Sequence, residues 1–405
     1  MADCLREKDV LILRDLAKRY YEIAMSDENV LLKKKWVDFN ERRISTTMLI
    51  VDEVPWWEFD CEELKNRCET PFARQIEDFF LRNLWMKENL DTDHVFDDHV
   101  KLPIVIEGCD FSITAVKESQ NARADRFCDL LKTEKDIEKI KPLPISVNKE
   151  KTELNASIYN DIFADVIPVK QTGRAVLFNA WDLLETWHGV ENCLFDMYDR
   201  PEFLHAIMRR ITDVTKHVIK NLEALKLLER PENLCYSPLY CEMDGEEGTA
   251  KNAWIFGTAQ IFSSASKEMH QEFELPYAQE IFSLFGRGYY GCCEPLHDRI
   301  DMVDKLPNVS KVSISPFANV FVAAENIGNR YIMSRKPTPS YLGTQSVNWD
   351  VIEEEIVSSL SACRSNNVSV EFILKDLTSV NGNPLRLKEW SQRARRIINE
   401  KGENT

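Results

Sequence analysis

The chain has 405 residues, of which 44% are apolar, so it holds enough hydrophobic material for one large core or for two ordinary domains. Its 67 acidic residues outnumber its 51 basic residues and give a formal charge of −16. Because nucleic acids and anionic membranes attract basic surfaces, this charge argues against binding to either. The composition is typical of a soluble enzyme or a protein-binding module.

The chain carries no sign of export or membrane insertion. Residues 1–24 are charged throughout and lack the apolar core and small-residue cleavage site of a secretory signal. No segment approaches the roughly twenty uninterrupted apolar residues of a membrane helix. The eleven cysteines are scattered and form no CxxC pair, which is typical of thiols in a reducing compartment. We therefore expect a cytoplasmic protein.

The first expected element is a helical extension over residues 1–43, because Leu13, Leu16, Tyr20 and Ile23 recur at helical spacing. A short apolar run over residues 48–51 follows and predicts the first buried strand. Polar and aromatic residues come directly after this run.

Seven further short apolar runs predict strands, and amphipathic helices separate several of them. The runs are KLPIVIEG (101–108), RAVLFNAWD (174–182), NLCYSPLYCEM (233–243), GYYGCCEP (288–295), VSKVSIS (309–315), RYIMSRKP (330–337) and VSVEFILKD (368–376). Alternation of strands and helices predicts an α/β fold with a parallel sheet. We expect a single (β/α)8 TIM barrel over residues 44–400, since no strand is followed by a dinucleotide-binding or phosphate-binding glycine loop.

Polar side chains stand at the ends of the predicted strands, where a barrel places its active site. We expect them to share one cavity. The predicted catalytic residues are Glu242, Glu294, Lys375 and Asp376, and the predicted substrate-binding residues are Glu53, Trp56, Trp57, Asp182, Tyr240, Tyr290 and Lys336. Taken singly, each has a structural alternative, such as core packing for the tryptophans and a surface ion pair for Lys375 and Asp376.

The loop after the fifth strand is a candidate metal site. Cys292, Cys293 and His297 could supply ligands, with Glu242 or Glu294 completing three protein ligands around a catalytic zinc. Such a metal would act as a Lewis acid on a substrate oxygen or sulfur. The alternative is a strand whose cysteines point into the core, because CCxxxH is not a standard zinc spacing.

The other histidines are expected to be structural. We place His270 on the surface of a helix, and we expect the acidic segment that contains His94 and His99 to be a solvated loop.

Three long runs, at residues 179–214, 266–320 and 371–397, together resemble the uroporphyrinogen decarboxylase-like superfamily over roughly Ile44 to Ile398. The resemblance implies a (β/α)8 barrel and either a cofactor-free decarboxylase or a zinc-dependent methyltransferase. The chain lacks the arginine signature of the decarboxylases near Arg42 and Arg43. It also has Tyr290 where the thiol-methylating branch has a histidine, so that Cys292 alone matches that branch's zinc ligands.

The leading hypothesis is a methyltransferase or demethylase of anaerobic one-carbon metabolism. It would hold a small methylated compound, such as a methoxylated aromatic, near Trp56 and Trp57 and pass the methyl group to a corrinoid (cobalamin-type) protein. A decarboxylase or lyase of a small carboxylate is the alternative, with Lys336 or Lys375 pairing the anion and Asp376 or Glu242 moving protons. The third possibility is a barrel that binds a ligand without catalysis.

Overall fold

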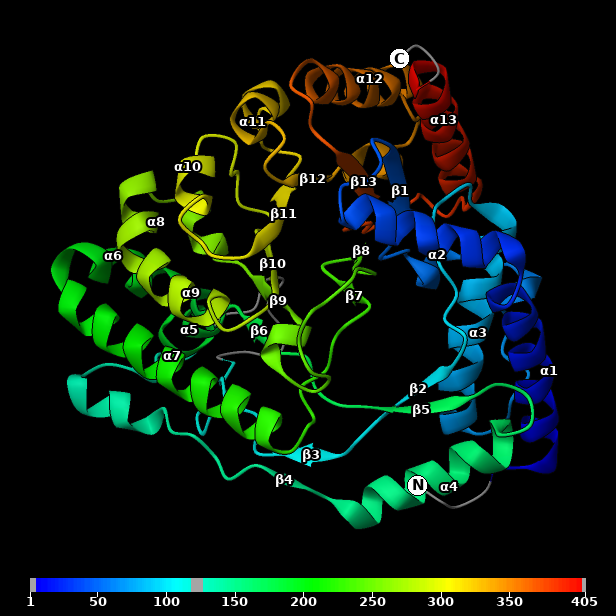
Figure 1. The fold of residues 1–405 in the computed structure, drawn as a ribbon, viewed down its shortest axis with the longest axis horizontal. Helices are drawn as coiled ribbons and strands as arrows, with labels where there is room; N and C mark the ends of the chain where they lie inside the picture. Colours follow the sequence, from blue (N-terminus) through cyan, green and yellow to red (C-terminus); the bar gives the residue numbers. More distant parts are fainter. Residues whose placement is uncertain (1–4, 118–126, 403–405) are drawn as a thin grey trace.

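Seven parallel strands form the central sheet of the computed structural model, which describes residues 5–117 and 127–402 (Figure 1). Their order across the sheet is β1-β13-β12-β11-β10-β9-β6. The strands are β1 (Thr47–Val51), β6 (Leu177–Phe178), β9 (Trp254–Gly257), β10 (Arg287–Tyr290), β11 (Val309–Ile314), β12 (Ile332–Arg335) and β13 (Val370–Leu374). The predicted α/β class is confirmed.

The first strand pairs with the last, which is the pairing that closes a barrel. β1 and β13 are in register from Thr47 opposite Val370 to Val51 opposite Leu374. The two edges of the sheet are β1 and β6, and within the described residues no strand bridges them. The strand order is therefore that of a (β/α)8 barrel with one wall position open.

The predicted second strand does not join the sheet. It divides into β2 (Val100–Pro103), which pairs with β5 (Val169–Thr172), and β3 (Ile106–Glu107), which pairs with β4 (Ser146–Val147). The proline at the end of β2 lacks the amide hydrogen that a central strand needs, which explains the break.

The prediction of a fourth strand over residues 233–243 was wrong. This segment is a hairpin of β7 (Asn233–Leu234) and β8 (Ser237–Pro238), because Cys235 and Tyr236 turn the chain with φ of 48° and 66°. The fourth strand of the wall is β9, a short run that the sequence interpretation passed over.

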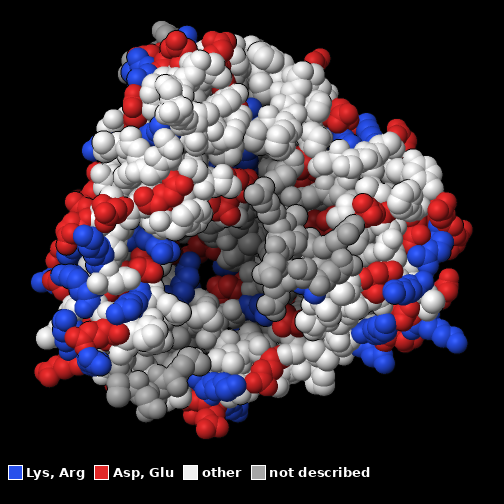
Figure 2. All heavy atoms as spheres, turned by 180° about the vertical axis from the view of Figure 1, so that it is seen from behind, with Lys and Arg blue, Asp and Glu red and all other residues white. Residues whose placement is uncertain are grey.

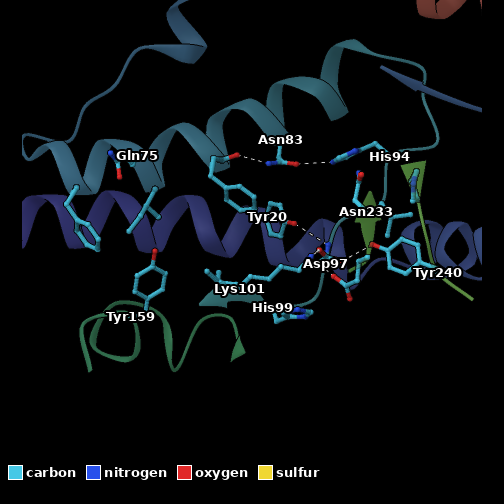
Figure 3. Close-up of a pocket in the computed structure, with 17 residues that line it drawn as sticks. Tyr20, Gln75, Asn83, His94, Asp97, His99, Lys101, Tyr159, Asn233 and Tyr240 are labelled. Carbon is cyan, nitrogen blue, oxygen red and sulfur yellow. Dashed lines mark hydrogen bonds and ion pairs between the residues drawn. The ribbon is translucent and has the colours of Figure 1, made fainter. Parts of the chain in front are cut away.

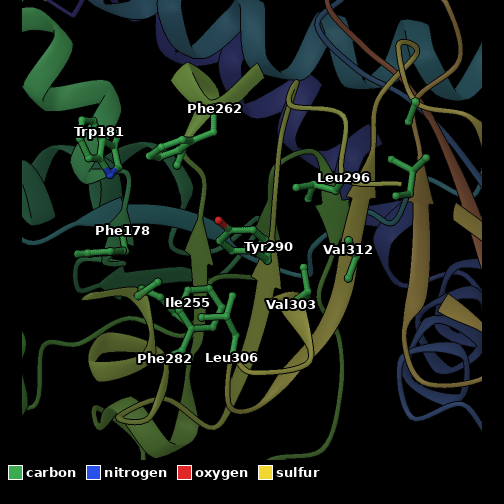
Figure 4. Packing of buried hydrophobic residues seen from close by; sticks show 14 of the residues in the cluster. Phe178, Trp181, Ile255, Phe262, Phe282, Tyr290, Leu296, Val303, Leu306 and Val312 are labelled. Carbon is green, nitrogen blue, oxygen red and sulfur yellow. The ribbon is translucent and has the colours of Figure 1, made fainter. Parts of the chain in front are cut away.

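Helices cover the outer face of the sheet and bury the main core. Ile255, Tyr290 and Val312 point outward from their strands into this core (Figure 4), which also contains Phe372. The helices that follow β6 in the chain are α5 (Ala180–His188), α6 (Val190–Asp199), α7 (Pro201–Ala224), α8 (Lys267–Phe273), α9 (Leu275–Phe282), α10 (Ile300–Val303), α11 (Val320–Ile327), α12 (Trp349–Ser365) and α13 (Leu385–Gly402). Short 3-10 helices are η1 (Trp56–Glu58), η2 (Glu62–Leu64), η3 (Glu134–Lys139), η4 (Ala250–Asn252), η5 (Gln260–Ser263) and η6 (Pro339–Gly343).

The inner face of the sheet is filled by the N-terminal segment and the hairpin. Helix α2 (Asp27–Asn40) inserts Trp36 and Phe39 against Met48 and Ile373, and the β7–β8 hairpin lies inside the curve of the sheet (Figure 1). Residues that alternate along a strand thus enter different cores: Tyr289 faces inward and Tyr290 outward.

A second layer lies at the side of the barrel. Helix α1 (Glu7–Ala24) packs against α3 (Pro71–Asn89) and α4 (Lys149–Phe163), with Leu16, Phe80 and Phe163 in one buried cluster. The expected extension is thus two helices, and the domain boundary at residue 43 stays a prediction. None of the helices in the described residues is long and apolar enough to cross a membrane. Acidic and basic side chains are interspersed over the face drawn in Figure 2.

Candidate functional site

Predicted site residues from four strands meet at the carboxyl end of the sheet. Residues directly after β1, β10, β12 and β13 converge there, and the turn of the β7–β8 hairpin reaches the same place. We call the group formed by Cys235, Cys292, Cys293, Lys336 and Lys375 the thiolate site. Cys292, Cys293, Lys336 and Lys375 were predicted from the sequence, and Cys235 was not.

Two thiols, Cys235 and Cys293, surround the sulfur of Cys292 in the thiolate site. The sulfur atoms of Cys292 and Cys293 are 3.7 Å apart, and Cys235 also hydrogen-bonds to Cys292. These hydrogen bonds, first from Cys235 and then from Cys293, lower the pKa of Cys292 against the opposing effect of burial, and the two lysines add to the shift. The same hydrogen bonds raise the pKa values of Cys235 and Cys293. The geometry therefore favours one thiolate at Cys292 with two thiol donors.

Lys375 supplies the nearest positive charge to this sulfur. Its Nζ lies 3.9 Å from Cys292 Sγ and donates to Asp376 Oδ2 at 2.5 Å. Burial alone would lower the pKa of Lys375, but the negative charges of Cys292 and Asp376 outweigh burial and raise it. Lys375 thus stays an ammonium beside the thiolate.

Lys336 is the second buried cation of the thiolate site. Its side chain is 1% exposed and donates to the hydroxyls of Tyr289 and Ser334. Burial lowers the pKa of Lys336, and the nearby thiols oppose that effect. Lys336 is held by its own neighbours rather than left free to pair with a substrate anion.

Two hydrogen bonds accepted by Glu53, which follows β1, join the hairpin turn to the residue after β13. Glu53 accepts from the Tyr236 hydroxyl at 2.5 Å and from the backbone N–H of Asp376 at 2.9 Å. Glu53, Cys235, Tyr236 and Asp376 all have positive φ, between 47° and 66°. Non-glycine residues in this region cost on the order of 1 kcal/mol each and cluster at functional sites.

The carboxylate of Glu294 holds the cysteine loop in place through several hydrogen bonds. Its buried carboxylate accepts from the backbone N–H groups of Cys292 at 2.9 Å and Ala259 at 3.2 Å, and from the Thr258 hydroxyl. Burial raises the pKa of Glu294. Glu294 therefore positions the cysteine loop, and its catalytic role stays a prediction.

Tyr290 points away from the thiolate site into the outer core. Its hydroxyl lies 2.8 Å from His270 Nε2, and His270 Nδ1 lies 3.1 Å from a nitrogen of Arg299. His270 is fully buried and stacked on Phe262, so the prediction of a surface position was wrong. Burial lowers the pKa of His270 to about 3, and the positive charge of Arg299 adds to this effect.

Asp182 lies at the edge of the thiolate site, and Glu274 is buried beyond it. Asp182 accepts from the backbone and side chain of Gln260 at 3.3 Å, and burial raises its pKa, with a smaller contribution from Cys292. Glu274 is fully buried, and neither of its carboxylate oxygens has a partner among the described residues. Burial raises the pKa of Glu274 well above its ordinary value, and the nearby carboxylates of Asp182 and Glu294 add to the shift.

Two predicted residues of the run 233–243 lie elsewhere. Glu242 is exposed and pairs with Arg43, next to Arg287, so it is at the amino end of the strands. The Tyr240 hydroxyl donates to Asp97 at 2.8 Å in a separate cavity. Both placements follow from the hairpin, which reverses the chain where a strand was expected.

Trp56 and Trp57, which together were predicted to hold the substrate, lie in different environments. Trp56 packs edge-on against Trp85 and Phe59 at the rim of the main core, whereas Trp57 is 75% exposed.

Of the predicted zinc ligands, Cys292 and Cys293 lie together, with their sulfur atoms 3.7 Å apart, but a third ligand does not join them in the part of the chain that the structure describes. Within the described residues, no group of three or more His, Cys, Asp or Glu side chains is arranged to hold a metal ion. His297 Nδ1 is buried without a partner, and its backbone carbonyl accepts from Asn326. The cation beside Cys292 is Lys375. This set of donors does not fit the predicted zinc.

Cys235 and Tyr236 are the two residues of the site that sequence reasoning missed. The signal available was the proline at position 238, which is unfavourable within a central strand and would have indicated a turn.

Solved structures similar to this chain include a methyltransferase and a methionine synthase. No protein-family model and no curated protein matches the chain. A methyltransferase from Methanosarcina mazei is 11% identical, covers 92% of this chain and 99% of its own, and has a TM-score of 0.47. A B12-independent methionine synthase from Shewanella sp. W3-18-1, in complex with selenomethionine, is 12% identical, covers 89% and 99%, and has a TM-score of 0.41. At these TM-scores the function has to be argued from the side chains of the site.

Proposed function

We propose that the protein is a methyltransferase in which the Cys292 thiolate takes a methyl group from a small methylated compound. The observation that carries this proposal is the environment of one sulfur: two thiols donate to Cys292, and Lys375 Nζ lies 3.9 Å away. A thiolate is the nucleophilic form of cysteine, and a lowered pKa keeps it populated at neutral pH.

The first step is a displacement at the methyl carbon. The sulfur of Cys292 forms a bond to the methyl carbon while the bond from that carbon to the donor's oxygen breaks. The oxygen leaves with the electron pair, and Lys375, already hydrogen-bonded to Asp376, supplies the proton it needs. Solvent returns that proton to Lys375.

The second step returns the thiolate. An acceptor nucleophile attacks the methyl carbon of the S-methylcysteine, and the sulfur leaves as the thiolate that Cys235, Cys293 and Lys375 stabilise. The same contacts therefore favour the leaving group of the second step. We propose a corrinoid carried by a partner protein as the acceptor and a methoxylated aromatic as the donor class.

The decarboxylase alternative keeps Asp376 as a proton-moving group but loses Glu242, and its two anion-pairing lysines already have partners. Glu242 lies at the opposite end of the strands, and both lysines are already engaged by Asp376, Tyr289 and Ser334. A carboxylate substrate would have to displace these partners.

Methyl transfer to free cob(I)alamin tests the proposal. Purified protein is supplied with one donor at a time, namely 4-hydroxy-3-methoxybenzoate, methanol, dimethyl sulfide or trimethylamine, and methylcobalamin is followed by absorbance. Transfer is expected from at least one donor and is expected to be lost in Cys292→Ser. Cys61→Ser, a free cysteine outside the thiolate site, is the matched control and should keep the activity. Equal activity in Cys292→Ser, or no transfer from any donor, would contradict the proposal.

A further inference from the structure

A cavity of about 430 Å³ lies beside the barrel, between α1, α3, α4 and the hairpin (Figure 3). It shares no lining residue with the thiolate site. Its size falls in the range of small-molecule pockets, roughly 300–1,000 Å³. We propose that it is a second ligand site, and that it takes an organic cation with an aromatic ring.

One part of the cavity is lined by aromatic and aliphatic side chains. Tyr20 comes from α1, Phe72, Ile76 and Phe79 from α3, and Tyr159 from α4. Tyr20 and Phe79 contact each other with ring centroids 5.6 Å apart, yet the Phe79 side chain is still 44% exposed. These rings offer an apolar surface that a flat ring can cover, and their faces attract a positive charge.

In the polar part of the cavity two carboxylates face one lysine, and a second lysine, Lys33, has its Nζ 4.9 Å from the ring centroid of Tyr240. Lys101 Nζ lies 3.0 Å from Asp97 and 2.6 Å from Glu232, so one cation faces two carboxylates. The Tyr240 hydroxyl also donates to Asp97, at 2.8 Å. A ligand ammonium would balance the remaining charge, whereas a ligand carboxylate would meet repulsion.

The two histidines of the cavity do not reverse this balance. His94 Nε2 lies 2.9 Å from Asn83 Oδ1, and burial lowers the pKa of His94 to about 4, so it is neutral at pH 7. His99 Nδ1 lies 2.8 Å from Asp98, an acidic partner. The segment expected to be a solvated loop is instead a wall of the cavity.

Hydrogen-bonding capacity is left over around the cavity. The side chains of Gln75, Tyr159 and Asn233 also line it; Gln75 and Asn233 are exposed and Tyr159 is half-buried, so all three can hydrogen-bond to a ligand in place of water. Figure 3 shows these three side chains around the same space as Asp97 and Lys101. Few polar groups among apolar walls are the usual composition of a small-molecule site.

Calorimetric titration with three matched probes tests the proposal. Phenethylamine has the ring and the cation, 3-phenylpropionate has the ring with a carboxylate, and n-butylamine has the cation without the ring. Phenethylamine is expected to bind at least tenfold more tightly than either of the others. Stronger or equal binding of 3-phenylpropionate, or no binding of phenethylamine, would overturn the proposal.

Variants then locate the binding. Glu232→Gln and Phe79→Ala are each expected to weaken phenethylamine binding at least fivefold, and circular dichroism shows whether each variant folds. Glu153→Gln, an exposed residue of α4 outside the cavity, should bind like the natural protein. Cys292→Ser should also bind normally, which separates this site from the proposed methyl transfer. Unchanged binding in both cavity variants would place the ligand elsewhere and overturn the proposal.

Discussion

The ammonium of Lys375 and the sulfur of Cys292 lie 3.9 Å apart, although they follow strands that are not neighbours. β12 and β11 stand between β13 and β10 in the sheet. Three strand spacings in a flat sheet would separate these strands by about 14 Å. The curl of the sheet and the length of the lysine side chain bring the two charges together, so the fold itself creates the stabilised thiolate.

Cys292 should be the most reactive thiol of the protein at low pH. An ordinary cysteine has a pKa of about 8.5 and loses reactivity tenfold for each pH unit below it. Because the hydrogen bonds of Cys235 and Cys293 lower the pKa of Cys292, its alkylation by iodoacetamide should stay nearly constant from about pH 8 to pH 6. Peptide mass spectrometry measures the rate at each cysteine. A tenfold fall per unit at Cys292 would show an ordinary thiol.

Replacing Lys375 should make Cys292 a weaker acid. Lys375→Met removes the nearest cation, so the pKa of Cys292 rises and its alkylation rate begins to fall at a higher pH than in the natural protein. Lys305→Met, an exposed position at the end of a helix, is the control and should leave the rate unchanged. An unaffected rate in Lys375→Met would mean that the thiols alone stabilise the charge.

Glu274 should make the protein less stable as the pH rises. Burial raises the pKa of Glu274 in the folded state, so its contribution to stability is present below the unfolded pKa and is lost as the pH rises towards the folded pKa. Glu274→Gln mimics the protonated acid and should raise the free energy of unfolding at pH 8 by at least about 1.4 kcal/mol, the value of one pKa unit. The gain should shrink at pH 5.

Urea unfolding at the two pH values measures this effect. Glu272→Gln, a position in α8 two residues before Glu274 and with a side chain that is 59% exposed, should change neither value. A destabilised Glu274→Gln at pH 8 would show that the folded protein holds a charged carboxylate there.

Phe39 should be as important for stability as a residue of the barrel itself. Its side chain is fully buried in the cluster that α2 forms with β1 and β13, so Phe39→Ala should cost about 3–5 kcal/mol in urea unfolding. Leu31→Ala on the same helix, at 66% exposure, should cost less than about 0.5 kcal/mol. A small effect of Phe39→Ala would indicate that α2 adds little to the stability of the barrel.

Strand prediction succeeded where short apolar runs were bounded by polar ends. The runs that contain β1, β6 and β10 to β13 were found in this way, and their polar ends include Cys292 and Lys375. The run 233–243 failed because apolar content alone cannot distinguish a buried hairpin from a strand. Glu242 was placed at the wrong end of the barrel for the same reason.

The remaining errors come from long-range packing. His270 lies in the middle of α8, a helix of seven residues. Helices of two turns carry too little periodicity to reveal a buried face. Cys235 reaches Cys292 because the β7–β8 hairpin lies inside the sheet, and the residues around Cys235 in the sequence do not indicate that position.

Trapping the methyl group on Cys292 tests the central claim most directly. The protein is mixed with a methyl donor and no acceptor, quenched and digested with trypsin, and the peptide of residues 288–299, which holds both adjacent cysteines, is fragmented. One added methyl group on the sulfur of Cys292, absent in Cys292→Ser, is the predicted result. Methyl transfer to cob(I)alamin with Cys292 never methylated, or a methyl group found only on Cys293, would contradict it.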